Sequence, residues 1–374
     1  MAPTSNERTP RRPGRVRVAV IFGGRSAEHD VSLRSAQTVI GALDPNRYEI
    51  MPIGVTREGR WLTGGDPFRQ LAEASPLFAL GAGDAGDVEP GPAGGVAAEP
   101  ALMPSVLDGE IDVVFPVLHG PMGEDGTVQG MLELAGIPYV GSGVLGSAVA
   151  MDKAASKTIL AQSGLPQVPW RLIGRKEWQR NPELVTEWVA ARLGFPCFIK
   201  PANMGSSVGV VKVHDASELQ PAMTAAGRFD RRIIIEAGID ARELEVSVLG
   251  NDEPVASVVG EVVSSNEFYD YDAKYVDERS QLIIPAELEG KTLVYCQELA
   301  IDAFRALDLA GLARVDFFLE RATDHIYVNE VNTLPGFTAI SMFPRLWEAT
   351  GVPLPELVDR LIGLALERHA ERRI

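Results

Sequence analysis

The chain has 374 residues, more than one ordinary hydrophobic core supports, so two or three domains are expected. Its formal net charge of −16 argues against a nucleic-acid-binding protein, which needs a basic face to neutralise phosphates, and against binding to anionic membranes. No apolar run is long enough to span a bilayer. We therefore expect neither a nucleic acid nor a membrane as partner.

The chain carries no pattern typical of an exported, disulfide-linked protein. Residues 1–15 are polar, Pro-rich and basic, without the apolar centre of a secretion signal, and are predicted to be a disordered tail. Cys197 and Cys296 are the only cysteines, and apolar neighbours favour buried free thiols. This cysteine content fits a reducing compartment, so we predict a cytoplasmic protein.

Residues 16–141 alternate between strand and helix patterns. The expected elements are strands at residues 16–22, 48–55 and 111–118 and helices at residues 26–43 and 128–135. Continuous apolar strands between helices are typical of a doubly wound, Rossmann-like α/β domain with a parallel sheet. Residues 81–100 interrupt the pattern with Gly, Ala, Pro and acids, and are predicted to be a surface insertion or mobile loop.

Two further domains of α+β type are predicted, at residues 142–238 and 239–374. The expected strands are at residues 170–173, 196–200, 209–213, 232–236, 243–249, 255–261, 312–319 and 325–331, and the expected helices are at residues 145–163, 182–193, 215–225 and 291–307. Residues 264–282 form a long polar stretch without periodicity, and a loop of this length in a compact domain is usually functional or disordered. We predict that this stretch is a lid.

Polar side chains alternate along the last two predicted strands. Because neighbouring side chains on a strand point to opposite faces, Arg314 shares a face with Asp316, and Glu330 with Asn332. The connection at residues 320–325 suits a hairpin that brings these faces together. Two carboxylates and an amide oxygen suit Mg²⁺, although a solvated polar face on an amphipathic hairpin explains the same pattern.

A small, flexible loop follows the strand that ends at Lys200. Its sequence, Pro-Ala-Asn-Met-Gly-Ser-Ser-Val-Gly, lets backbone N–H groups close on phosphate oxygens, and a strand follows it. It lacks the Walker pattern and resembles instead a flap over phosphates. A Gly-Ser turn without a binding role is the alternative.

Further candidate functional residues lie at two strand ends and in the polar loop. Glu28 lies where a Gly turn meets a helix N-terminus, a suitable anion site, although an acid in that turn also simply matches the helix dipole. His119 follows the strand at residues 111–118, where doubly wound folds bind ligands, although a lone His at a strand end is more often structural. The Tyr-Asp-Tyr-Asp-Ala-Lys-Tyr segment ending at Tyr275 is either part of the lid or an ordinary solvated loop.

Together these patterns resemble the D-alanine–D-alanine ligases, members of the ATP-grasp superfamily. The resemblance spans about residues 16–366 and keeps the order of seven motifs. The motifs are Gly-Gly-Arg-Ser-Ala-Glu-His-Asp-Val-Ser, His-Gly-Pro-Met-Gly-Glu-Asp-Gly, Met-Asp-Lys, Lys-Pro-Ala-Asn-Met-Gly-Ser-Ser-Val-Gly, Tyr-Asp-Tyr-Asp-Ala-Lys-Tyr, Arg-Val-Asp-Phe-Phe and Asn-Glu-Val-Asn-Thr-Leu-Pro-Gly-Phe-Thr. The resemblance implies a three-domain ATP-grasp fold whose first domain is the Rossmann-like preATP-grasp domain.

The resemblance also implies a two-step reaction for peptidoglycan precursor synthesis. ATP phosphorylates the carboxylate of a first D-alanine, and the amine of a second D-alanine attacks the resulting acyl phosphate. ATP and D-alanine are then the small-molecule substrates, and two Mg²⁺ ions, which Mn²⁺ can replace, assist the phosphoryl transfer. Family members can be activated by K⁺, and many are homodimers.

On the ATP side, the resemblance assigns roles position by position. The residues that match ATP-binding positions are Lys153, Lys200, Ser207, Glu236, Ala237, Ile239, Glu243 and Asn329. Asp316, Glu330 and Asn332 match the metal ligands, with Glu330 expected to bridge two ions. Arg314 and the N–H of Gly336 match the donors that stabilise the tetrahedral intermediate.

On the D-alanine side, Glu28, Ser206 and Tyr275 match a hydrogen-bonded chain at the ammonium of the first D-alanine. The other positions that match substrate-binding residues are His119, Lys274, Ser341 and Met342. Tyr275 favours D-alanine as the second substrate, because members that accept D-lactate often carry Phe there or lack the motif. Met204 departs from members that carry Glu at this position.

Two alternatives to this function remain, one a ligase of the same family and one a protein without enzymatic activity. One is a ligase that forms a D-alanine–D-lactate or D-alanine–D-serine product. The other is a nucleotide-binding homologue without activity, which should have lost a metal ligand, Arg314 or a phosphate lysine. All of these residues are present.

Overall fold

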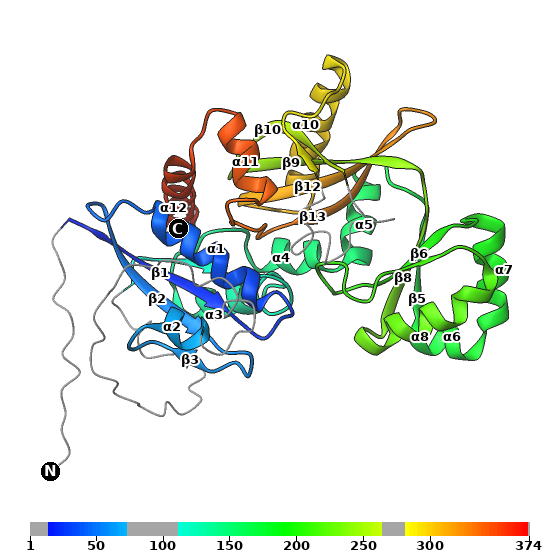
Figure 1. Ribbon diagram of the computed structural model, residues 1–374, viewed down its shortest axis with the longest axis horizontal. Coiled ribbons are helices and arrows are strands. Elements are labelled where there is room, and N and C mark those ends of the chain that lie inside the picture. The colour runs from blue at the N-terminus through cyan, green and yellow to red at the C-terminus, as the bar shows by residue number, and fades with distance from the viewer. Residues whose placement is uncertain (1–13, 73–110, 264–280, 373–374) are drawn as a thin grey trace, which may run out of the picture.

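The structure is a computed structural model that describes residues 14–72, 111–263 and 281–372. Most of the predicted tail, the insertion at 81–100, and Lys274 and Tyr275 of the predicted lid lie outside the described residues. Three separate sheets form the framework, with the first sheet at the left of Figure 1, the sheet of β6 and β8 at the right, and a five-stranded sheet between and above them.

The first sheet has the strand order β3-β2-β1-β4. Strands β1 (Val16–Gly23), β2 (Tyr48–Val55) and β4 (Val113–Val117) are parallel, and the short edge strand β3 (Trp61–Leu62) is antiparallel to β2. The accompanying helices are α1 (His29–Ala42), α2 (Pro67–Ala72) and α3 (Thr127–Ala135). Parallel strands joined through helices confirm the predicted α/β class.

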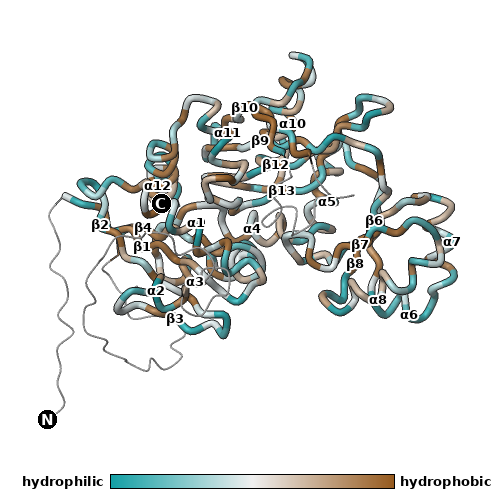
Figure 2. The backbone as a smooth tube through the Cα atoms, viewed as in Figure 1, coloured by the Kyte–Doolittle hydropathy of each residue, from teal (hydrophilic) through white to brown (hydrophobic). Residues whose placement is uncertain are grey.

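The second sheet is antiparallel and has the order β5-β8-β6-β7. Its strands are β5 (Trp170–Gly174), β6 (Cys197–Pro201), β7 (Val211–Val213) and β8 (Arg232–Ala237). The helical elements beside it are α6 (Arg175–Arg180), α7 (Pro182–Arg192), η2 (Ala216–Glu218) and α8 (Leu219–Phe229). Figure 2 shows apolar residues gathered in the strands and polar residues along the outer helices.

The third sheet is also antiparallel, in the order β11-β10-β9-β12-β13. Its strands are β9 (Ala241–Gly250), β10 (Val255–Val263), β11 (Gln281–Ile283), β12 (Gly311–Glu320) and β13 (Ile326–Asn332). The helices that follow or cover it are α10 (Gly290–Ala306), α11 (Met342–Ala349) and α12 (Leu354–Glu371). Among the described helices, none combines the length and the apolar content that crossing a bilayer requires.

The helix predicted at residues 145–163 is two helices, so the prediction of one continuous helix is wrong. Asp152 separates α4 (Val144–Met151) from α5 (Lys153–Gln162) with an extended backbone, φ −82° and ψ 102°. Its carboxylate accepts hydrogen bonds from the N–H groups of Ala154 and Ala155 and forms an ion pair with Arg232. An N-cap aspartate thus starts a new helix with Lys153 as its first residue.

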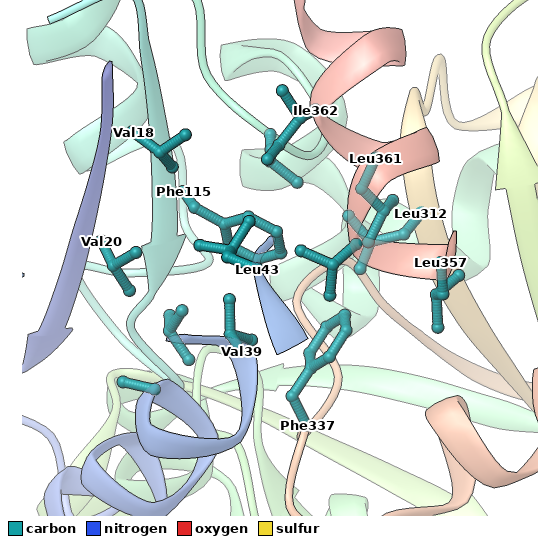
Figure 3. Packing of buried hydrophobic residues seen from close by; sticks show 14 of the residues in the cluster. Val18, Val20, Val39, Leu43, Phe115, Leu312, Phe337, Leu357, Leu361 and Ile362 are labelled. Carbon is teal, nitrogen blue, oxygen red and sulfur yellow. The ribbon is translucent and has the colours of Figure 1, made fainter. Parts of the chain in front are cut away.

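One hydrophobic cluster joins the first sheet to the C-terminal part of the chain. Figure 3 shows Val20 of β1 and Phe115 of β4 in the same cluster as Leu361 of α12. Phe337, from the segment between β13 and α11, belongs to it as well, and its ring meets that of Phe115 edge-on at 5.9 Å between centroids. The segment after β13 is therefore held against the first sheet. Cys197 and Cys296 are both buried free thiols, as predicted.

Candidate active site

The hairpin of β12 and β13 brings its polar side chains onto one face. Arg314 pairs with Asn332 and Asp316 pairs with Glu330, so the two faces that strand alternation predicted meet in the hairpin. A bulge after Asp316 leaves Asn329 unpaired, so Asn329 and Glu330 are both partly exposed in succession. The bulge therefore adds an amide to the row of carboxylates.

Two carboxylates fix the guanidinium of Arg314. Its Nε and Nη2 donate to Oδ1 and Oδ2 of Asp316 at 2.6 and 2.7 Å, and its Nε also lies 2.9 Å from Oε2 of Glu245 on β9. Burial lowers the pKa of Arg314, but Asp316 and Glu245 outweigh burial and raise the pKa well above its ordinary value. The guanidinium is therefore a fixed cation beside the polar face.

Asp316, Glu330 and Asn332 were predicted to be metal ligands. The Nδ2 of Asn332 donates to Oδ2 of Asp316 at 3.0 Å, and Oε2 of Glu330 lies 3.6 Å from Nζ of Lys153. Within the described ranges, no cluster of three or more His, Cys, Asp or Glu side chains could hold a metal ion. Two carboxylates and one amide oxygen are the types of ligand that suit a hard ion such as Mg²⁺.

A second charged group lies where β6 and β8 meet. Lys200 donates from Nζ to Oε2 of Glu236 at 2.5 Å, and Nζ of Lys157 lies 3.3 Å from Oε1 of the same carboxylate. Burial raises the pKa of Glu236, but the two ammonium groups outweigh it and lower the pKa to about 2. Burial lowers the pKa of Lys200, but Glu236 outweighs burial and raises it, whereas for Lys157 the pKa stays lowered.

The loop between β6 and β7 closes toward the first sheet through left-handed backbone. The φ angles of Ser206, Ser207 and Gly209 are 46°, 58° and 74°. The hydroxyl of Ser206 donates a short hydrogen bond to Oε1 of Glu28, and Nζ of Lys153 donates to the carbonyl of Met204 at 2.7 Å. The predicted contact between Glu28 and Ser206 is thus present, and it ties the start of α1 to the loop.

His119 follows β4, as predicted, and is buried. Its Nδ1 lies 2.9 Å from the carbonyl of Leu334, and its Nε2 lies 3.0 Å from the hydroxyl of Ser35. Burial lowers the pKa of His119, but the carboxylate of Glu124, 3.7 Å from Nδ1, outweighs burial and raises it. Ser35 also accepts the N–H of Phe337 at 3.1 Å, so the imidazole and this serine hold both ends of the 334–337 turn.

That turn presents Gly336 beside the start of α11. A Cβ atom on Gly336 would lie 2.8 Å from Oγ of Ser341, so a side chain at this position would force Ser341 to move. Ser341 stands at the N-cap of α11, and its hydroxyl accepts the N–H of Thr338 at 3.0 Å. Met342, the next residue, is buried in a small cluster with Val262.

Two neighbouring pockets collect most of the predicted residues. The larger is lined by Glu28, His119, Ser206, Arg314, Glu330, Asn332, Gly336, Ser341 and Met342, among others. The other is lined by Lys153, Asn329, Glu330 and Asn332, among others. Of the predicted residues that the structure describes, those that line neither pocket are Lys200, Ser207, Glu236, Ala237, Ile239, Glu243 and Asp316. Apart from Ser207 and Asp316, these residues lie on or next to β6, β8 and β9.

Three residues of this region were not predicted individually. Glu124 lines both pockets, Glu245 contacts Arg314, and Lys157 contacts Glu236. Each had a sequence pattern that could have indicated it. Glu124 belongs to the Gly-rich motif after His119, Glu245 shares a strand face with Glu243, and Lys157 lies one helical turn after Lys153.

A Rossmann-like first sheet, two antiparallel sheets, and a Gly-Ser loop that follows Lys200 and lines a pocket with the carboxylate hairpin define an ATP-grasp enzyme. Family models described as D-ala D-ala ligase N-terminus and D-ala D-ala ligase C-terminus match residues 17–142 and 159–363. The chain therefore belongs to the D-alanine–D-alanine ligase family and is an ATP-using ligase.

Individual relatives are similar to this chain over nearly its whole length. The D-alanine–D-alanine ligase of Heliobacterium modesticaldum is 51% identical over 358 residues, covering 95% of this chain and 96% of the relative. The solved D-alanine–D-alanine ligase of Coxiella burnetii is 37% identical, with a TM-score of 0.78 and 96% of each chain covered. The solved VanG D-Ala:D-Ser ligase of Enterococcus faecalis is 35% identical, with a TM-score of 0.77, covering 94% of this chain and 99% of the other.

Proposed function

We propose that this protein joins two D-alanine molecules into D-alanyl-D-alanine for peptidoglycan precursors, with ATP as the energy source. The observation that carries the proposal is a single pocket that gathers the acid Glu28, the cation Arg314 and the carboxylate Glu330. An amino acid needs an acid for its ammonium group, and its developing oxyanion needs a cation. Phosphoryl transfer needs oxygen ligands for a metal.

The chemistry divides into two group transfers. A carboxylate oxygen of the first D-alanine bonds to the γ-phosphorus of ATP while the bond to the ADP oxygen breaks. The amine of the second D-alanine then attacks the carbonyl carbon, loses a proton to solvent, and expels inorganic phosphate with the former carboxylate oxygen. Because neither transfer requires a protein nucleophile, the protein acts mainly by positioning and charge stabilisation.

We assign the residues to these steps by their places. Glu28 and Ser206 receive the first D-alanine, Arg314 and the N–H of Gly336 stabilise the intermediate, and Lys153 and Lys200 contact the phosphates. The remaining residues proposed to hold ATP are Ser207, Glu236, Ala237, Ile239, Glu243 and Asn329. The remaining residues proposed to hold the D-alanines are His119, Tyr275, Lys274, Ser341 and Met342. Both lid residues, Lys274 and Tyr275, rest on the sequence alone.

Asp316, Glu330 and Asn332 would hold Mg²⁺, and two ions with Glu330 as a bridge are proposed. When bound, the ions would neutralise phosphate charge that otherwise repels the attacking carboxylate. Mn²⁺ satisfies the same oxygen ligands, and K⁺ is proposed as an activator.

The competing products are D-alanyl-D-lactate and D-alanyl-D-serine. Relatives of about 50% identity, such as the ligase of Ruminiclostridium cellulolyticum, are named D-alanine–D-alanine ligases, whereas the D-Ala:D-Ser ligase is 35% identical. The residues proposed for catalysis are all present, which also speaks against an inactive nucleotide-binding homologue.

The test measures ADP release and product masses with D-alanine alone and with added D-lactate or D-serine. We expect rapid ADP release and D-alanyl-D-alanine from D-alanine alone, and a Glu330→Gln variant that loses most of this turnover. Turnover that requires D-lactate or D-serine would overturn the assigned product. Normal turnover of Glu330→Gln would overturn the metal assignment.

We further propose a cytoplasmic homodimer of three-domain subunits, divided at residues 141/142 and 238/239, with no nucleic-acid or membrane partner. Free, buried cysteines support the reducing compartment. Sedimentation analysis checks the dimer, with a monomer at micromolar concentration as the contrary result.

A further inference from the structure

Lys157 is a buried cation whose role the proposed reaction leaves open. Its side chain is 2% exposed, and its ammonium lies 3.3 Å from Oε1 of Glu236, which is also 2% exposed. Lysines are almost never buried this deeply unless they are paired. In the described part of the chain, neither Nζ of Lys157 nor Oε1 of Glu236 has a hydrogen bond of good geometry to any other group. The two atoms therefore depend on each other.

Glu236 is shared between two lysines with different surroundings. Its other oxygen, Oε2, accepts from Lys200 at 2.5 Å, and the side chain of Lys200 is 12% exposed. Lys157 enters from α5, whereas Lys200 lies on β6 next to β8. Of the two ammonium groups, the one on Lys200 thus has more freedom to turn toward a ligand.

The ion pair between Lys200 and Glu236 would oppose the binding of a nucleotide phosphate to Lys200. A phosphate that binds the ammonium of Lys200 competes with Glu236 for the positive charge of that lysine. A buried carboxylate that loses its only counter-charge is strongly destabilised. With Lys200 as its only partner, Glu236 would therefore hold that lysine back from the phosphate.

We infer that Lys157 is a positioning residue, the fixed counter-charge of Glu236 that frees Lys200 to contact the nucleotide phosphates. The inference rests on the proposed use of ATP at this site. Lys157 acts through Glu236, and contact between Lys157 and the nucleotide is not required.

The electrostatics of the group agree with such an exchange. Burial lowers the pKa of Lys157, and the charge of Lys200 lowers it further, while Glu236 raises it. When the ammonium of Lys200 moves toward a phosphate, the repulsion on Lys157 falls and its attraction to Glu236 remains. The ion pair between Lys157 and Glu236 therefore becomes stronger when Lys200 moves away.

The experiment measures binding of ADP with Mg²⁺ by calorimetry, without D-alanine, to the parent chain and its variants. We expect Lys157→Met to bind ADP at least tenfold more weakly than the parent, because Glu236 retains Lys200. Adding Glu236→Gln to Lys157→Met should recover at least fivefold of this loss, since a neutral amide does not hold the ammonium and its carbonyl oxygen still accepts a hydrogen bond from the nucleotide. Lys176→Met, which removes an exposed lysine of α6, is the matched control and should bind like the parent.

A second comparison does not depend on the folding of Lys157→Met alone. Once Glu236→Gln is present, adding Lys157→Met should change ADP binding by less than about twofold and raise the melting temperature, because it removes a buried, unpaired cation.

The contrary results separate the two proposals. A parent chain that binds no ADP would overturn the proposed function, and the inference with it. A parent that binds ADP, with Lys157→Met binding equally well, would overturn the inference alone. So would a double variant that binds no better than Lys157→Met, since Lys157 would then act other than through Glu236.

Discussion

At the scale of single residues, the candidate site is organised by charges that share partners. Arg314 contacts Asp316 and Glu245, and Glu236 contacts Lys157 and Lys200. A charged group with two partners still has one counter-charge when its second partner turns away to contact a ligand. This arrangement suits a site whose charged groups must move from protein partners to substrate.

Glu245 offers a direct test of this idea, because it would hold Arg314 while Asp316 turns to the proposed metal ion. We expect Glu245→Gln to lower kcat/KM for D-alanine about tenfold, or about 1.4 kcal/mol, because the buried guanidinium of Arg314 loses one of its two carboxylate counter-charges. Steady-state kinetics measure the effect. Glu356→Gln is the control, because Glu356 forms an exposed ion pair with Arg360 and should leave kcat/KM unchanged. Equal kinetics for both variants would refute the role of Glu245.

The sequence predicted contacts along a strand better than contacts between strands. Alternation alone placed Arg314 with Asp316 and Glu330 with Asn332, because it needs no knowledge of the partner strand. Glu245 was missed because its contact with Arg314 depends on the register of β9 against β12, which pairs Asp316 with Glu245. Lys157 was missed because it lies on the helix α5, whereas its partner Glu236 lies far along the chain on β8.

At the scale of elements, the loop between β6 and β7 links the second sheet to the first. Its left-handed residues allow the hydroxyl of Ser206 to reach Glu28. Gly209 permits this path, because a Cβ atom there would lie 2.6 Å from the ring of Phe229 and 2.9 Å from Pro201.

We therefore expect Gly209→Ala to raise KM for ATP severalfold or more, because the loop must shift to relieve the clash. Gly130→Ala, in α3, provides the comparison, since nothing lies within 4 Å of the added Cβ. That variant should retain parental kinetics and be as stable as the parent or slightly more so. Steady-state kinetics at varied ATP concentration measure KM for ATP in both variants. An unchanged KM for Gly209→Ala would argue against a role of the loop in nucleotide binding.

Element prediction failed where local patterns were interrupted or subtle. The apolar periodicity of residues 145–163 runs through Asp152, so it concealed the N-cap that starts α5. No helix was predicted after β13, although α11 and α12 are present and Ser341 stands at the N-cap of α11. Long, continuous apolar strands such as β1 and β2 were predicted almost to the residue.

At the scale of the whole molecule, the C-terminal helix α12 contributes to the core of the first sheet. Leu361 is fully buried there beside Phe115, and Phe337 belongs to the same cluster. This packing holds the 334–337 turn, and with it Gly336, against the strand end that carries His119. The pocket is therefore assembled from segments at both ends of the chain.

Leu361→Ala should lower the free energy of unfolding by about 2–5 kcal/mol, because it leaves a cavity in this shared core. Urea denaturation followed by circular dichroism measures the change. Leu134→Ala removes a leucine that is 92% exposed and should change stability by no more than about 0.5 kcal/mol. Similar losses in the two variants would show that α12 is not part of a common core.

The central claim is that ATP activates a D-alanine carboxylate as an acyl phosphate. The most direct test supplies D-alanine with both carboxylate oxygens replaced by ¹⁸O, together with unlabelled ATP, and analyses the released phosphate by mass spectrometry. Because the bond between the carboxylate oxygen and phosphorus survives the second step, each released phosphate should carry one ¹⁸O. Unlabelled phosphate, or label found in AMP, would contradict the proposed reaction.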